Sequence, residues 1–85
     1  MNTRGWIEVI PEKNRKHLEL YSNLLAQATQ SGHAETVTEY AKKMRGYLEC
    51  MEDCGTISES GLKALYLYYR SVRVDGIVKK ASESA

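Results

Sequence analysis

The sequence has few of the residues that mark specialised protein classes. It has two cysteines, one proline and no phenylalanine among 85 residues. It also lacks an apolar run long enough to cross a membrane. Two cysteines are too few for a disulfide scaffold, and residues 1–10 lack the apolar stretch of a secretory signal. We therefore expect a cytoplasmic protein that does not enter a membrane.

An excess of charge of one sign is also lacking. Twelve basic and eleven acidic side chains leave a formal net charge of +1, whereas general polyanion binders are usually strongly basic. A chain of 85 residues makes one domain at most and buries a thin core. Small helical chains often compensate for a thin core by self-association. A second copy of the chain is therefore one candidate partner.

The sequence does contain helical periodicity. Apolar residues at spacings of three and four predict a helix over residues 11–30. A 4-3-4-3 repeat predicts a second helix over residues 34–53. Gly32 and Gly55 follow these segments, and glycine commonly ends helices. Gly46 lies inside the second predicted helix, where we expect it to mark a close crossing with another helix.

A third helix is predicted over residues 57–74. Thr56-Ile57-Ser58-Glu59 fits the capping box that begins many helices, with Thr56 as the cap, and an Asp-Gly pair follows as an end signal. Short connections make consecutive helices antiparallel neighbours. The predicted fold is therefore all-α, an up-down-up arrangement of a helical hairpin plus a third helix. It forms a single domain over residues 1–78, and residues 79–85 are predicted to be a disordered tail.

Two segments carry a competing β signal. Residues 1–10 lead into Pro11 and predict an arm, in which Trp6–Ile10 is a short strand or an extended segment packed on the helices. Val72–Val78 places β-branched residues around an Asp-Gly pair, which is a hairpin pattern. The sequence thus allows a short β element at either the N-terminal or the C-terminal end of the fold.

Residues that could perform chemistry are scattered along the chain. Cys50 and Cys54 lie four apart on the second predicted helix, and His17 could approach them from the first. Zinc usually takes four ligands, however, so we interpret both cysteines as small packing residues and expect no metal site. The sequence contains no recognisable catalytic motif that combines a nucleophile, a base and an orienting group. We therefore expect no enzyme activity and no cofactor.

The third predicted helix has more apolar residues than one face can bury. Leu67 and Tyr68 point away from the face that carries Leu62 and Leu65, and a helix that is apolar nearly all round needs cover on every side. Tyrosine and arginine are also enriched at binding hot spots. We therefore predict a non-catalytic interaction or regulatory protein that binds another protein or a second copy of itself. The predicted contact residues are Trp6, Tyr66, Leu67, Tyr68 and Arg70.

Nucleic-acid binding is the alternative hypothesis for the same region. Basic side chains outnumber the single acid Asp75 between Leu62 and Lys80, and tyrosines interleave with them. Cationic side chains bind phosphates, and aromatic rings stack on exposed bases. The second predicted helix ends in acidic residues, which would repel a phosphate backbone, so this function ranks second. Its predicted contact residues are Lys63, Arg70, Arg73, Lys79 and Lys80.

Overall fold

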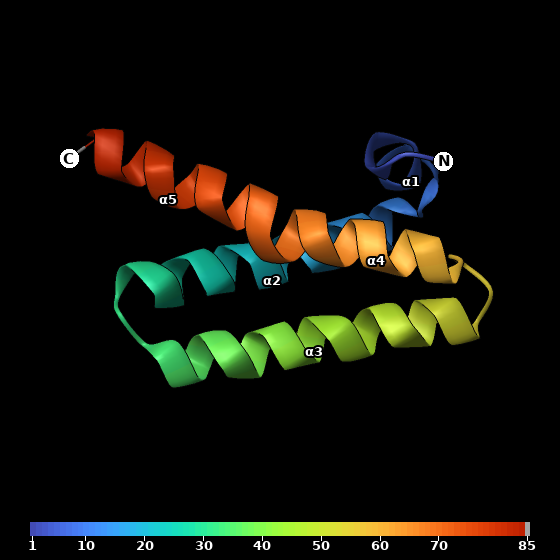
Figure 1. The fold of residues 1–85 in the computed structure, drawn as a ribbon, viewed down its shortest axis with the longest axis horizontal. Helices are drawn as coiled ribbons and strands as arrows, with labels where there is room; N and C mark the ends of the chain where they lie inside the picture. The colour runs from blue at the N-terminus through green and yellow to red at the C-terminus, as the bar shows by residue number, and fades with distance from the viewer. Residues whose placement is uncertain (85) are drawn as a thin grey trace.

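The computed structural model describes residues 1–84, which fold into helices joined by short connections (Figure 1). This part of the chain contains no strand, and the prediction of an all-α fold is confirmed. The elements in chain order are α1 (Thr3–Val9), α2 (Glu12–Gln30), α3 (Ala34–Asp53), α4 (Glu59–Leu67), the π-helical segment η1 (Tyr68–Val72) and α5 (Arg73–Ser84).

The helices are arranged as a hairpin with a helical rod lying along it. α2 and α3 form the antiparallel hairpin, and α4, η1 and α5 return along it as one continuous rod (Figure 1). α4 packs against α3 and α1, whereas α5 packs against α2. The three long segments thus run up, down and up, and α1 is an additional helix that the sequence pattern did not predict.

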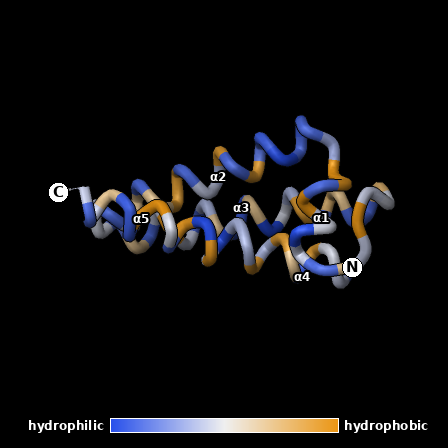
Figure 2. The backbone as a smooth tube through the Cα atoms, turned by 90° about the horizontal axis from the view of Figure 1, so that it is seen from above, coloured by the Kyte–Doolittle hydropathy of each residue, from blue (hydrophilic) through white to orange (hydrophobic). Residues whose placement is uncertain are grey.

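The hairpin forms because apolar residues recur at helical spacing on both of its helices. Leu18 and Leu25 of α2 are fully buried in one core cluster with Met44 of α3. Figure 2 shows the hydrophobic residues as short orange segments spaced along the helices, with hydrophilic residues between them. The two turns depend on Gly32 and Gly55, whose φ angles of 72° and 78° are ones that glycine adopts without steric cost.

A helix stands where the sequence predicted an extended arm. The Asn2 side chain caps α1 by accepting a 2.8 Å hydrogen bond from the Gly5 amide. Ile10 then leaves the helix in an extended conformation before Pro11, as the residue before proline should. The predicted strand or extended segment is wrong for Thr3–Val9. A lone strand would leave its backbone groups unpaired, whereas a short helix satisfies most of them internally.

The rod begins and ends elsewhere than the sequence predicted. The Ser58 hydroxyl, rather than Thr56, caps α4 by accepting a 3.2 Å hydrogen bond from the Gly61 amide. Val72–Val78 is helical, so the hairpin alternative is wrong. α5 runs from Arg73 to Ser84, and Val74 in its first turn is buried in the core. Residues 79–84 are helical rather than disordered, and residue 85 of the predicted tail lies outside the described residues.

A π turn redirects the rod halfway along its length. The Arg73 amide donates to the carbonyl of Tyr68, five residues back, instead of to the carbonyl of Tyr69. The Tyr69 carbonyl therefore loses its α-helical donor, and the buried hydroxyl of Ser22 on α2 donates to it instead. The extra residue in this turn allows α4 to pack against α3 while α5 follows α2.

The contact between α1 and α4 depends on a glycine. A Cβ atom on Gly61 would lie 2.8 Å from Cε2 of Trp6, so the indole ring rests directly on the backbone of α4. The Arg15 guanidinium also donates to the Ile7 carbonyl at 3.1 Å, which ties the end of α1 to α2. A Cβ atom on Gly46 would meet nothing within 4 Å, so the close helix crossing expected there is wrong.

We expect Ser22→Ala to lower the free energy of unfolding by about 1–3 kcal/mol, because the Tyr69 carbonyl would be buried without a donor. Denaturant unfolding followed by circular dichroism measures this difference. Ser82→Ala on the exposed side of α5 is the matched control, and we expect it to change the stability by less than about 0.5 kcal/mol. Equal responses of the two variants would contradict the role given to Ser22.

We expect Gly61→Ala to displace the Trp6 ring from α4, because the new methyl group would occupy the space of the indole. Trp6 is the only tryptophan, so its fluorescence should shift to longer wavelength as the ring meets water. Gly46→Ala is the control, with unchanged fluorescence and a gain in stability of up to about 1 kcal/mol. An unchanged spectrum in Gly61→Ala would show that this contact is absent.

Candidate functional site

The outer side of the rod carries exposed apolar side chains. Leu67 is 60% exposed and Val72 is 55% exposed, although Leu65 and Tyr69 on the inner side are fully buried. Residues three and four apart on a helix are neighbours, so further side chains connect Leu67 to Val72. Together they form a continuous strip, the α4–η1 ridge, which consists of Ala64, Leu67, Tyr68, Ser71 and Val72.

The ridge is bare because α1 covers another part of the rod. α1 has seven residues and packs against α4, where Trp6 meets Gly61 in the first turn. The helix face that starts at Gly61 continues into Tyr68 and Val72 at spacings of seven and four. Tyr68 is half-buried and Val72 is exposed. The apolar face is therefore longer than the helix that covers it.

A cleft adjoins the ridge, between α5 and the turn that joins α2 to α3. It encloses about 490 Å³, with an apolar lining that includes Ala28, Val37 and Val74 and a charged lining that includes Arg70 and Asp75. The cleft opens because the rod leaves α3 at the π turn and follows α2 instead. Leu67 lies one turn before Arg70, so the cleft continues the ridge.

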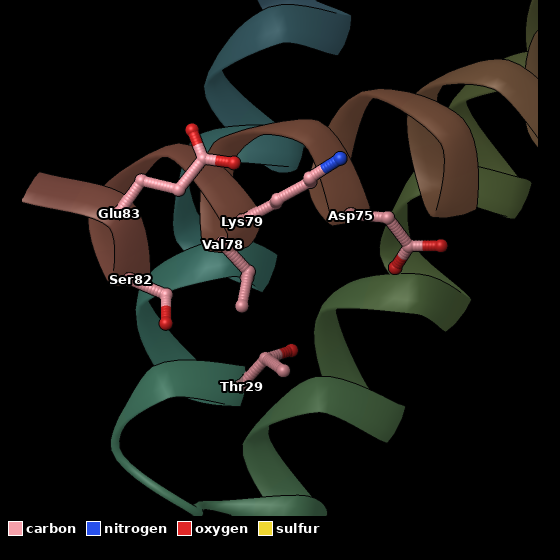
Figure 3. Close-up of a pocket in the computed structure, with 6 residues that line it drawn as sticks. All are labelled: Thr29, Asp75, Val78, Lys79, Ser82 and Glu83. Carbon is pink, nitrogen blue, oxygen red and sulfur yellow. The ribbon is translucent and has the colours of Figure 1, made fainter.

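A second hollow extends the cleft along α5 toward the end of the rod (Figure 3). In this view Val78 and Thr29 face each other across the gap, and Lys79 extends along α5 toward Asp75. Ser82 and Glu83 complete the lining of this hollow, which has a volume of about 390 Å³. The α4–η1 ridge and this two-part cleft together form the candidate docking surface.

The structure brings three of the five predicted protein contacts to this surface. Leu67 is an exposed apolar residue of the ridge, Arg70 lines the cleft, and Tyr68 also lies on the ridge. The Tyr68 ring meets the Tyr69 ring edge to face, with the centroids 5.0 Å apart. Tyr68 is therefore shared between the core and the surface.

The other two predicted contacts point elsewhere. The Tyr66 ring lies toward α3, with the Arg45 guanidinium 5.4 Å from its centroid. Trp6 packs on Gly61 and is half-buried there. Val72 belongs to the surface but was missed, because regular helical spacing over the predicted helix 57–74 places it on the same face as Leu65 and Tyr69. The π-helical segment changes that spacing, and Val72 is 55% exposed.

The predicted nucleic-acid contacts do not gather in one place. The Arg73 guanidinium donates to the Glu19 carbonyl at 3.3 Å and to Oδ1 of Asn23 at 2.9 Å, so it ties α5 to α2. The Lys63 amine pairs with Glu59 at 3.4 Å. Lys63 and Lys80 stand about 25 Å apart along the rod, at 1.5 Å per residue. Lys79 and Lys80 are exposed on α5, and Arg70 lines the cleft.

His17 is engaged in aromatic packing within the hairpin. Its ring stacks on Tyr47 with the centroids 4.2 Å apart and meets the edge of Tyr21 at 4.9 Å. No group of three or more histidine, cysteine or acidic side chains that could hold a metal ion occurs among residues 1–84. Nor does that part of the chain include a helix long and apolar enough to cross a membrane.

Tyr69 lies under the ridge and is 1% exposed. Burial raises the pKa of its phenol from 10 to about 12, and the nearby Glu19 carboxylate adds to the increase. The neutral phenol is favoured because an ionised oxygen would lose its hydration in this position. Tyr69 is therefore a protonated core residue beneath the surface.

We expect the chain to lose stability as the pH rises from 10 to about 12, because the unfolded phenol of Tyr69 ionises near 10 and the folded one near 12. In this window the unfolded state releases the proton first, so the free energy of unfolding falls with increasing pH. Urea unfolding at several pH values should show a smaller loss for Tyr69→Phe than for the wild type. Parallel pH profiles of the two proteins would contradict the pKa shift.

No protein-family model matches this chain, and no curated protein or solved structure matches it either. The function is therefore inferred from the geometry of the docking surface. That surface offers exposed apolar side chains and an amphipathic cleft.

Proposed function

We propose that this chain is a non-catalytic interaction or regulatory protein. It acts by binding another protein, or a second copy of itself, through the candidate docking surface. The exposure of Leu67 supports this proposal most directly. Leu67 is 60% exposed on a rod whose opposite side is fully buried at Leu65 and Tyr69. A partner that covers Leu67 and Val72 would complete the burial of a helix that its own chain covers on one side.

The chemistry of the surface favours a protein partner. Burying a leucine side chain contributes about 1.5–3 kcal/mol, and the apolar lining of the cleft, with Ala28, Val37 and Val74, offers further area. Arg70 forms no ion pair with another described residue, so its guanidinium is available to a partner carboxylate. An amphipathic helix laid along a hydrophobic groove is a common solution for such surfaces.

We expect Leu67→Ser to weaken self-association by about tenfold or more, since it removes most of the burial that Leu67 offers. Sedimentation velocity over a range of protein concentrations measures the association constant. Leu20→Ser is the matched control, because Leu20 is 51% exposed on α2 and lies outside the docking surface. Both variants should keep the wild-type circular dichroism spectrum and unfolding midpoint. A monomer at several hundred micromolar would rule out self-association.

A different protein partner is tested by site-specific photo-crosslinking in the native cell. A photoreactive amino acid at position 67 should give one discrete adduct, and the same amino acid at position 20 should not. Nucleic-acid binding predicts other results. A complex held by phosphates weakens steeply as salt rises, and it would respond to charge reversal at Arg70 rather than to Leu67→Ser. Equal crosslinking from both positions would contradict the docking surface.

A further inference from the structure

Two thiols stand together at the end of α3 that is opposite the cleft. Cys50 and Cys54 are the only cysteines, and both are free and exposed. Cys50 lies in the last turn of α3, and Cys54 ends the helix with φ −81° and ψ −2°. The helical path therefore continues through both positions. Both side chains are accessible to a ligand from solvent.

The spacing of these two thiols excludes one reaction and favours another. Residues four apart on a helix lie on one face, with Cβ atoms about 5–6 Å apart. A disulfide needs Cβ atoms about 3.5–4.5 Å apart, so Cys50 and Cys54 cannot join directly without unwinding the helix end. A single atom placed between the two sulfurs can bridge this wider separation.

The supply of ligands determines which atom fits between them. Thiolates select soft cations such as Cu(I) and Zn(II), and structural zinc takes four ligands. No cluster of three or more metal-ligating side chains exists within residues 1–84. His17, the third ligand considered from the sequence, is stacked on Tyr47 instead. Two sulfurs are thus the ligands that residues 1–84 offer at this place, which suits a cation that accepts two-coordinate, linear binding.

We propose that Cys50 and Cys54 form a two-thiolate site for Cu(I). In the binding step two S–H bonds break and two Cu–S bonds form, and two protons pass to solvent. Copper enters and remains as Cu(I), so no electron is transferred. The exposed carboxylates of Glu49 and Asp53 beside the pair attract cations to this end of α3.

The thiol pair lies apart from the cleft and is not among the residues that form the ridge. The cleft lies at the turn between α2 and α3, whereas the two thiols lie at the opposite end of α3, about 30 Å away for a helix of 20 residues. Copper bound across the last turn would restrain that turn and the chain that leads through Gly55 to α4. Binding to the folded state alone would also raise the unfolding temperature.

The test is a competition for Cu(I) between the reduced protein and the coloured chelator bicinchoninate, without oxygen. We expect the wild-type chain to remove one Cu(I) per molecule. Cys50→Ser and Cys54→Ser should each lower the affinity for Cu(I) by at least about a hundredfold. Each variant keeps one thiol, and the gain from binding one ion through two linked thiols is lost. Circular dichroism verifies that the variants remain helical. Failure of the wild type to take copper would overturn the proposal and leave the function proposed for Leu67 untouched.

A variant with two thiols in the wrong places provides the matched control. Cys54→Ser combined with Glu52→Cys keeps two cysteines but places them two apart, on different sides of α3. We expect this double variant to bind Cu(I) as weakly as the single serine variants. Wild-type affinity in the double variant would show that spacing has no role and would overturn the proposal. So would displacement of the bound Cu(I) by an equal concentration of Zn(II), which would return the colour of the copper–bicinchoninate complex.

Discussion

The hydrogen bond from Ser22 to the Tyr69 carbonyl is the interaction on which the shape of the rod depends. A π turn leaves one carbonyl without its α-helical donor, and a buried polar group without a partner is costly. Ser22 supplies the donor from a fully buried position on α2. The hairpin therefore stabilises the irregular turn of the rod that lies on it. Arg73 makes a further tie in the next turn, to Glu19 and Asn23 of α2.

The redirection of the rod produces the surface to which the proposed function is assigned. Before the π turn the rod covers α3, and after it the rod covers α2. The first half of α3 is left beside an open cleft, and Val37 becomes part of its lining. A regular helix through Tyr68–Val72 would bury a different set of side chains. The ridge and the cleft are thus two results of one change in helical register.

The sequence predicts those parts of the fold that follow from regular periodicity. Helices were expected over residues 11–30 and 34–53, and α2 and α3 occupy Glu12–Gln30 and Ala34–Asp53, because one apolar stripe per helix suffices to pack a hairpin. The pattern around Trp6 predicts an extended segment because its side chains are equally common in strands. The helix that forms there begins at the Asn2 cap. Regular helical pitch correctly predicts that Leu67 is exposed. It predicts neither the cleft nor the exposure of Val72, because both depend on the π turn, which breaks that pitch.

The π turn also sets the phase of α5 relative to α4. It accommodates one residue more than an α-helix would, so a regular α-helix through the same residues would rotate α5 by about 100° relative to α4. Val74 would then leave the core, and Arg73 would point away from its two acceptors on α2. Removing one residue between Tyr68 and Val72 would instead turn the five-residue turn into an ordinary α-helical turn. The rod could therefore lose the extra residue of the π turn without changing which side of α5 faces the core.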